Sequence, residues 1–268
     1  MSNTPAVDTQ ALTRRFRTLT AVDSLTLSVE SGSVFGLLGP NGAGKTTAIK
    51  MLTTLLPPTS GTATVAGADI VRHPVAVRRA IGYVPQMLSA DGTLTGYENL
   101  LIFAKLYGVS RVQRKKRVRD ALAFMNLEEA EDKLVRQYSG GMIRRLEIAE
   151  AMLHEPRVLF LDEPTVGLDP VARQAVWERI VRFRADYGTT VFLTTHYMEE
   201  ADALCERVAI MHRGKVVASG SPAELKESIG GNGATLDEVF AHYTGDVLES
   251  GGTYGDTRRT RRTARRLG

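Results

Sequence analysis

The segment Gly39–Thr46 reads GPNGAGKT and fits the phosphate-binding pattern G-x-x-x-x-G-K-[ST] at every fixed position. Glycines let successive backbone N–H groups of such a loop point into one concavity, and the helix that follows adds a favourable field for anions. Lys45 is expected to reach the β- and γ-phosphates of a nucleotide, and the Thr46 hydroxyl to bind Mg²⁺. We assign these loop residues to the site: Gly39, Pro40, Asn41, Gly42, Ala43, Gly44, Lys45, Thr46 and Thr47. The segment predicts binding of a nucleoside triphosphate.

Two acidic residues, Asp162 and Glu163, directly follow the apolar run Val158–Leu161. An acid at the end of a buried strand, downstream of a phosphate loop, is how Mg²⁺ is held opposite the phosphates. A second carboxylate directly after it is placed to orient or deprotonate an attacking water. The pair therefore predicts hydrolysis of the bound nucleotide.

Two more polar residues follow predicted strands: Gln86 after Ile81–Val84, and His196 after Thr190–Thr194. Ligands of open α/β sheets bind just beyond the carboxyl ends of the strands. We therefore predict that His196 contacts the γ-phosphate. Gln86 has two interpretations, a sensor of the phosphates or an ordinary polar loop residue, and its own surroundings favour the loop.

Three further candidates have structural explanations as well. Phe16 ends a predicted strand, where its ring could stack on a nucleotide base or belong to the core. Ser139–Gly141 opens a predicted helix and offers backbone N–H groups to an anion, although turns often contain Ser-Gly-Gly. Asp169, before Pro170, is expected to cap another helix.

The predicted elements form an α/β core that can position these residues. Val34–Leu38, an apolar run before the phosphate loop, predicts a buried parallel strand, and Thr46–Leu56 after the loop is compatible with a helix. Residues 11–29 alternate between apolar and polar side chains, which is typical of a small antiparallel sheet. Residues 93–153 carry capping boxes and a helical apolar stripe, and we interpret them as a helical insertion between two halves of the core.

The composition is that of a soluble globular protein, with 43% hydrophobic and 24% charged residues. No apolar run approaches the roughly 20 residues of a membrane-spanning helix, and no signal pattern precedes the first strand, so we expect a cytoplasmic chain. The single cysteine, Cys205, suits a reducing compartment and is predicted to fill the core rather than to act as a nucleophile.

The net charge of +4 and the pI of about 9.2 could indicate a nucleic-acid partner. However, residues 246–268 contain six arginines and three acids, a net of +3, which leaves +1 for residues 1–245. We therefore predict an Arg-rich disordered tail over residues 247–268, a nearly neutral folded body and no nucleic-acid partner. The basic run Arg111–Arg119 is interpreted as the solvated face of a helix.

Taken in their order along the chain, the motifs resemble those of the ATP-binding subunit of ATP-binding cassette (ABC) transporters, over about residues 11–245. Phe16 matches the adenine-stacking aromatic, and Gly39–Thr47 matches the phosphate loop. Gln86 matches the Q-loop, and Ser139–Met142 matches the signature loop.

Leu159–Glu163 matches the Mg²⁺ strand with its catalytic glutamate, Asp169 the D-loop, and His196 the switch histidine. The resemblance implies a RecA-like P-loop NTPase core over residues 1–246, with a small antiparallel β subdomain and a helical signature subdomain at about 87–155. It implies ATP and Mg²⁺ as cofactors. The implied catalytic residues are Glu163, His196, Gln86 and Lys45, and the implied metal contacts are Thr46, Gln86 and Asp162.

The resemblance also implies partners. Two cassettes of this family pair head to tail, so that Ser139, Gly140 and Gly141 of one complete the ATP site of the other, and we expect a homodimer with two ATP molecules at its interface. A separate membrane permease is expected, with this subunit peripheral on the inner face of the cell membrane.

Within the family, the sequences YSGGM, DEPTVGLDP and TLDEVF look like the daunorubicin-resistance type of exporter subunit, which implies a drug, lipid or glycolipid as cargo. Met142 stands where most cassettes have glutamine, and Glu150 where arginine is expected. Neither change removes a catalytic group. Three alternatives stay open: a soluble ABC ATPase acting on ribosomes or DNA, an importer subunit, and a nucleotide-binding regulator, which an intact Glu163 and His196 disfavour.

Overall fold

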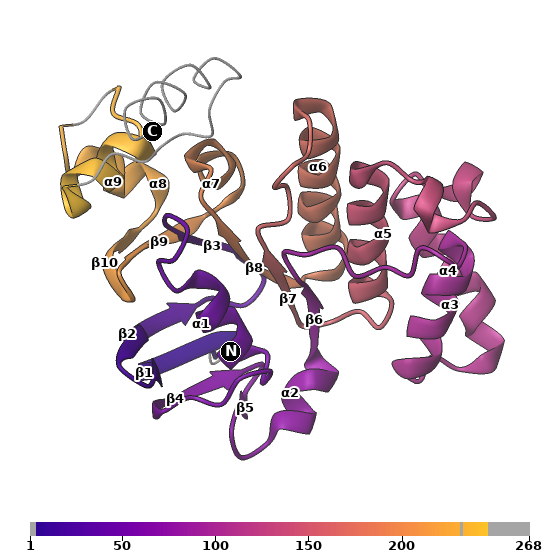
Figure 1. The fold of residues 1–268 in the computed structure, drawn as a ribbon, viewed down its shortest axis with the longest axis horizontal. Coiled ribbons are helices and arrows are strands. Elements are labelled where there is room, and N and C mark those ends of the chain that lie inside the picture. Colours follow the sequence, from indigo (N-terminus) through magenta and orange to yellow (C-terminus); the bar gives the residue numbers. More distant parts are fainter. Residues whose placement is uncertain (1–3, 231–232, 246–268) are drawn as a thin grey trace, which may run out of the picture.

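The computed structural model describes residues 4–230 and 233–245 of the chain. Its centre is a six-stranded sheet with the strand order β10-β9-β3-β8-β7-β6 (Figure 1). The strands are β3 (Val34–Leu38), β6 (Ile81–Val84), β7 (Val158–Asp162), β8 (Thr190–Thr195), β9 (Arg207–His212) and β10 (Lys215–Gly220). Neighbouring strands are parallel from β9 to β6, and β10 is antiparallel to β9. The carboxyl ends of β3, β6, β7 and β8 therefore meet at one edge.

A smaller antiparallel sheet has the order β2-β1-β4-β5 and occupies the lower left of Figure 1. Its strands are β1 (Val7–Phe16), β2 (Leu19–Val29), β4 (Ser60–Val65) and β5 (Ala68–Asp69). Helix α1 (Lys45–Leu52) contacts both sheets. It ends before Leu56, the end that the sequence predicts, because Thr54 turns to a φ of 63°, which is outside the helical region.

Helices α3 (Gly96–Leu106), α4 (Arg111–Phe124) and α5 (Gly140–Met152) lie between β6 and β7 in the sequence, and α3 and α4 form the right-hand side of Figure 1. Helix α5 contacts α3 and α4 on one side and β6 and α6 on the other, so it joins these helices to the central sheet. The remaining helices are α2 (Pro74–Ala80), α6 (Pro170–Tyr187), α7 (Met198–Leu204), α8 (Pro222–Glu227) and α9 (Leu236–Thr244), with short 3₁₀ turns at Glu128–Ala130 and Val135–Gln137. The subdomain boundaries at about 87 and 155 stay a prediction.

Alternate residues of the central strands pack on opposite faces of the large sheet. Phe35, Phe160 and Phe192 belong to the cluster that includes α1 and the small sheet, and their ring centroids lie 5.1–5.4 Å apart along the chain Phe35–Phe192–Phe160. Leu161 and Leu193 belong to the cluster with α5 and α6. Burial on both faces explains why these strands are continuous apolar runs. Cys205 is buried in the second cluster, as predicted, and burial raises the pKa of its thiol.

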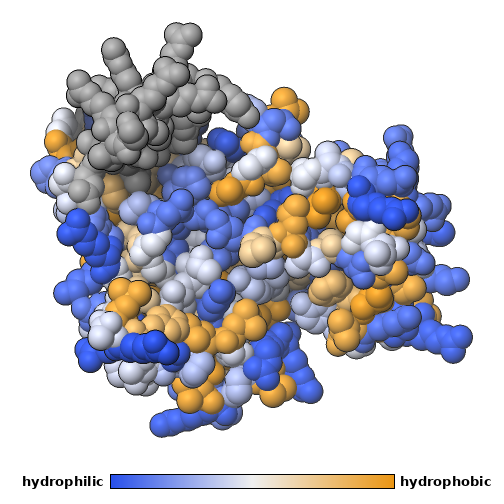
Figure 2. All heavy atoms as spheres, viewed as in Figure 1, coloured by the Kyte–Doolittle hydropathy of each residue, from blue (hydrophilic) through white to orange (hydrophobic). Residues whose placement is uncertain are grey.

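Helix α4 buries Val118 and Leu122, while most of its basic side chains are exposed. Figure 2 shows hydrophilic side chains along the right-hand edge, where α3 and α4 lie. The prediction that Arg111–Arg119 forms a solvated face is therefore confirmed. Over the described ranges, 4–230 and 233–245, none of the helices is long and apolar enough to cross a membrane. The predicted Arg-rich tail lies outside the described residues.

Glu150 of α5 is 3% exposed, and its Oε1 atom is buried without a hydrogen-bond partner. Burial raises the pKa of its carboxyl group to about 8, and the charge of Glu147, one turn earlier, adds to this effect. The side chain that replaces the expected arginine is thus a carboxyl group whose neutral form is favoured at neutral pH.

We predict that the free energy of unfolding falls as pH rises from about the ordinary carboxyl value of 4.5 to about 8, because the folded state binds the Glu150 proton more tightly than the unfolded state does. Glu150→Gln should remove this part of the pH dependence and stabilise the protein at pH 8 by several kcal/mol. Urea unfolding of both proteins at pH 5, 6.5 and 8 measures the difference. Parallel curves for the two proteins would contradict the assignment.

Candidate nucleotide-binding site

A cleft of about 680 Å³ opens at the carboxyl edge of the large sheet. The phosphate loop and the start of α1 form its floor, and the turn between β1 and β2 forms one wall. Gln86, after β6, and Glu163, after β7, also line it. Loops that follow β3, β6 and β7 therefore meet here, as expected for the carboxyl edge of a parallel sheet.

The phosphate loop needs glycine at two of its positions for lack of space. A Cβ atom on Gly39 would lie 2.2 Å from the Met211 carbonyl oxygen, and one on Gly44 would lie 2.3 Å from the Ala21 carbonyl oxygen. Both residues also have positive φ values, 152° and 109°, which other residues rarely adopt. Gly44 begins α1 without a side-chain cap, so the helix start presents backbone N–H groups to the cleft.

Lys45 is the buried cation of the cleft, with 4% of its side chain exposed. Its Nζ atom donates to the carbonyl oxygens of Gly39 (2.7 Å) and Pro40 (3.2 Å) and lies 3.0 Å from Glu163 Oε1. The ammonium group is therefore held above the loop by groups that phosphate oxygens could replace.

Asp162 ends β7 opposite Thr46. Its Oδ1 atom accepts from the hydroxyls of Thr46 (3.2 Å) and Thr194 (2.6 Å), whereas its Oδ2 atom is buried without a partner. Burial and the charge of Glu163 raise the pKa of this carboxyl group against the opposing effect of the two hydroxyls and Lys45.

An unpartnered carboxylate oxygen beside a hydroxyl fits a hard cation such as Mg²⁺, which prefers oxygen ligands. The described residues contain no group of three or more histidine, cysteine, aspartate or glutamate side chains that could hold a metal by themselves. One carboxylate with phosphate oxygens is, however, a usual way in which proteins bind Mg²⁺. Asp162 and Thr46 could therefore hold this ion together with a nucleotide.

Glu163 is the centre of the polar contacts. Its Oε1 atom pairs with Lys45, and its Oε2 atom accepts from Gln86 Nε2 (3.0 Å) and lies 3.3 Å from His196 Nδ1. Burial opposes ionisation, but the neighbouring His196 and the charge of Lys45 together lower the pKa of the carboxyl group. The φ of Glu163 is 49°, and its N–H donates to the carbonyl and hydroxyl oxygens of Thr194, which fixes this uncommon conformation.

Phe16 lines the cleft with 41% of its surface exposed, and the Arg14 guanidinium lies over its ring at 4.6 Å from the centroid. This exposure contradicts the interpretation of Phe16 as a core residue. The ring position leaves base stacking as its proposed role.

The structure does not bring the signature-loop and D-loop candidates into this cleft. The Ser139 hydroxyl accepts from Met142 N–H (3.3 Å) at the start of α5, and Asp169 accepts from Ala172 N–H (2.9 Å) at the start of α6. A Cβ atom on Gly141 would lie 3.0 Å from Ala172 Cβ, so the two helix starts are neighbours. The chain thus presents two separate groups of candidate residues.

Sequence reasoning missed two parts of the cleft wall, Leu19–Ala21 and Arg213–Gly214. Gly214 donates to the Ala43 carbonyl (2.9 Å), which ties the β9–β10 turn to the phosphate loop. A turn between two strands has an ordinary structural explanation, so the sequence gives no sign of a ligand at this place.

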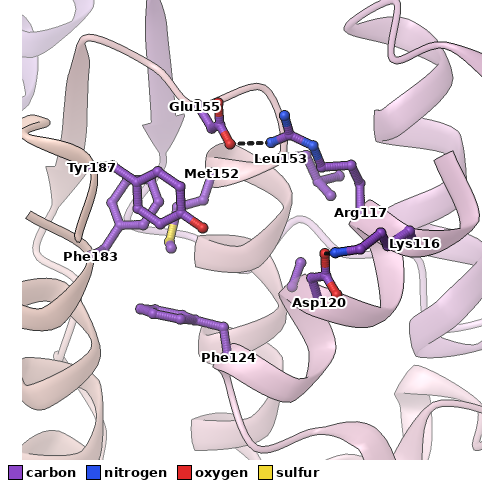
Figure 3. A pocket seen from close by; sticks show the side chains of 10 residues that line it. Lys116, Arg117, Asp120, Phe124, Met152, Leu153, Glu155, Phe183 and Tyr187 are labelled. Atoms are coloured by element: carbon purple, nitrogen blue, oxygen red, sulfur yellow. Dashed lines mark hydrogen bonds and ion pairs between the residues drawn. The ribbon is translucent and has the colours of Figure 1, made fainter. Parts of the chain in front are cut away.

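A smaller hollow of about 350 Å³ lies between α4, the end of α5 and α6 (Figure 3). Phe124, Phe183 and Tyr187 line it, and the ion pair Arg117–Glu155 spans one side. No phosphate-loop residue lines this hollow, and it shares no lining residue with the larger cleft. We therefore assign the nucleotide to the larger cleft.

Comparison with known proteins agrees with this geometry. A family model described as ABC transporter matches residues 22–166. The chain belongs to the ABC transporter family. It is an ATP-hydrolysing ABC subunit with the α/β P-loop NTPase fold that the sequence predicts.

Two relatives show the similarity. The daunorubicin/doxorubicin resistance ATP-binding protein DrrA of Streptomyces peucetius is 48% identical over 229 residues, which cover 85% of this chain and 69% of that protein. The Nod factor export ATP-binding protein I of Ralstonia nicotianae is 43% identical over 225 residues, which cover 84% of this chain and 70% of that one. The predicted resemblance to the daunorubicin-resistance type is therefore confirmed.

Two solved structures have the same fold. An ATP-binding subunit of an ABC transporter aligns with a TM-score of 0.80 and 31% identity, over 89% of this chain and 99% of that chain. An ATP-binding cassette in a dimeric post-hydrolysis state with ADP and Pi aligns with a TM-score of 0.72 and 26% identity, over 80% of this chain and 98% of that chain.

Proposed function

We propose that this chain powers the export of a drug, lipid or glycolipid through a separate membrane permease. The observation that carries the proposal is the set of contacts around Glu163, which joins a buried lysine, a glutamine and a histidine at the mouth of the phosphate loop. The export direction is supported by relatives named for daunorubicin resistance and Nod factor export. These names give no support to a ribosome- or DNA-associated ATPase or to an importer.

In the proposed mechanism Lys45 leaves Glu163 and neutralises charge on the β- and γ-phosphates. Glu163 then accepts a proton from the attacking water, which Gln86 orients, and His196 contacts the γ-phosphate. Phe16 stacks on the adenine, and the backbone N–H groups from Gly39 to Thr47 surround the phosphates. Thr46, Asp162 and Gln86 would hold Mg²⁺, which would supply positive charge to stabilise the charge developing on the phosphates.

We propose that the active form is a head-to-tail homodimer with two ATP molecules. Ser139–Gly141 and Asp169 lie outside the cleft of their own chain, so they can serve ATP only from a second copy. The dimeric cassette with ADP and Pi, which shares this fold, supports the arrangement.

The proposed permease contact lies directly after Gln86. Met87 and Leu88 are 81% and 50% exposed, although apolar side chains of this size are usually buried. A membrane partner that covers them would sit beside the residue that contacts Glu163. On this basis the subunit works on the inner face of the cell membrane, as a peripheral component.

A transport assay tests the proposal. We expect membrane vesicles that contain this chain and its permease to move daunorubicin, as the probe, only when ATP is present, and Glu163→Gln to stop the movement. A Met87→Ser, Leu88→Ser double variant should keep the ATP turnover of the isolated subunit and lose its association with the permease. If this double variant copurifies with the permease as well as the unaltered chain, the contact surface is wrong. If no membrane protein copurifies with either, the transport function is wrong.

A further inference from the structure

Arg144 and Glu147 of α5 form a buried pair that holds the loop after β6. Arg144 donates to the carbonyl oxygens of Pro85 and Gln86, each at 2.7 Å, and its Nη1 atom lies 3.1 Å from Glu147 Oε2. The other carboxylate oxygen of Glu147 accepts from the N–H and the hydroxyl of Ser89. Two side chains of one helix thus fix both ends of the segment 85–89.

Both side chains are almost completely buried, at 3% and 2% exposed. A buried ion pair is weak evidence for stability, because removing two charges from water costs about as much as their attraction returns. Among the described residues, the hydrogen bonds of Arg144 go to two loop carbonyls, and its contact with Glu147 is an ion pair. The pair is therefore built to position the backbone of this loop.

The loop in turn contacts the centre of the nucleotide site. The carbonyl of Gln86 accepts from Arg144, and the side-chain amide of the same residue donates to Glu163 Oε2 at 3.0 Å. Helix α5 begins at Gly140, directly after its N-cap Ser139 and about one turn before Arg144. Two contacts therefore connect the helix that carries the signature residues to the carboxylate proposed to accept the proton.

We propose that Arg144, oriented by Glu147, is a positioning residue for ATP hydrolysis: by holding the Gln86 backbone, it sets the place of the Gln86 side chain against Glu163. Turnover then depends on Arg144, whereas binding of ATP to the phosphate loop does not. This inference rests on the proposed role of Glu163.

Arg144→Met, which keeps an unbranched stem and removes the donors, should lower kcat about 10–100-fold, because small displacements of positioning groups have effects of this size. The Kd for a fluorescent ATP analogue should stay within about twofold, since Lys45 and Thr46 are unchanged. Arg144→Lys can reach fewer of the three oxygen groups that Arg144 contacts, namely two loop carbonyls and the Glu147 carboxylate. It should give an intermediate kcat, and it replaces Arg144→Met in the test if the methionine variant does not fold.

Arg145→Met is the matched control. Arg145 is the next residue of the same helix, and it donates to the carbonyl oxygens of Met125 (2.8 Å) and Asn126 (3.2 Å), away from the loop. It should lose less thermal stability than Arg144→Met, because it breaks no buried ion pair, and it should keep kcat per folded molecule. Equal losses of kcat in the two variants would mean that Arg144 is only structural and would overturn the proposal.

The pathway is tested in a Gln86→Ala background, which removes the amide that contacts Glu163. If Arg144 acts through Gln86, adding Arg144→Met there should change kcat by less than about twofold. Full multiplication of the two effects would refute the pathway. Glu163→Gln, measured in parallel, separates a failure of the proposed site from a failure of the positioning role. If Glu163→Gln keeps full turnover, the proposed catalytic site is wrong. If it is inactive but the Arg144 and Gln86 effects multiply fully, only the positioning role of Arg144 is wrong.

Discussion

Glu163→Gln is expected to lower ATP turnover by ~10²–10⁴-fold, the usual contribution of a positioned general base. Glutamine keeps the size of the side chain and can still accept the hydrogen bond from Gln86, but it does not accept a proton from water. Lys45, Thr46 and Asp162 are unchanged, so ATP should still bind. Phosphate release and equilibrium binding of ATP, measured on the same preparation, give the two quantities.

This variant should also accumulate as an ATP-bound dimer, because both subunits hold nucleotide that is no longer consumed. Sedimentation with and without Mg²⁺ and ATP measures the change in mass. Glu178→Gln is a suitable control, since Glu178 lies on α6, accepts a hydrogen bond from Gln174 and does not line the cleft. It should behave like the unaltered chain.

A second substitution in this background tests the geometry of the dimer. In Glu163→Gln, Ser139→Arg a bulky cation stands at the start of α5 and should prevent closure, so the protein should stay monomeric with ATP. If the double variant still dimerises, the signature residues do not face the second nucleotide, even if the phosphate loop and Glu163 act as proposed.

Lys45→Ala should reduce hydrolysis by at least ~10³-fold and also weaken ATP binding, because the ammonium group neutralises phosphate charge in both the ground state and the transition state. It should cost stability as well, since Glu163 loses its buried ion-pair partner, and breaking such a pair costs ~3–5 kcal/mol. Nucleotide titration and thermal unfolding measure the two effects.

The matched control for this variant is Lys50→Ala, in the last turn of the same helix, where the side chain is exposed. Removing this lysine should change neither turnover nor ATP affinity. Near-normal hydrolysis by Lys45→Ala would instead refute the assignment of Gly39–Thr47 to the phosphates.

Several properties could be predicted from local sequence because they depend on residues close together in the chain. The phosphate loop needs its glycines, lysine and threonine within eight positions, and the strand and helix around it are visible as an apolar run and a helical stripe. Fold class, family and ATPase activity followed from the order of such local motifs and are confirmed. The roles of the individual site residues stay predictions.

The contacts between motifs were decided only by the tertiary structure. Thr46 and Asp162 are 116 positions apart, Gln86 and Glu163 are 77 apart, and Arg144 and Gln86 are 58 apart. No local periodicity reports on pairs at such separations. They meet because parallel strands bring their carboxyl ends to one edge, and because α5 packs against β6.

The exposure of individual side chains was also decided by the tertiary structure. Phe16 and Met87 are apolar residues that a sequence pattern would equally place in a core, yet both are exposed, whereas Arg144 and Glu147 are charged and buried. The sequence by itself determined which chemical groups this ATPase has and which local elements hold them. Only the folded chain decided which groups share a cleft and which charges face a backbone loop, because exposure and pairing depend on atoms from distant segments that converge at each position.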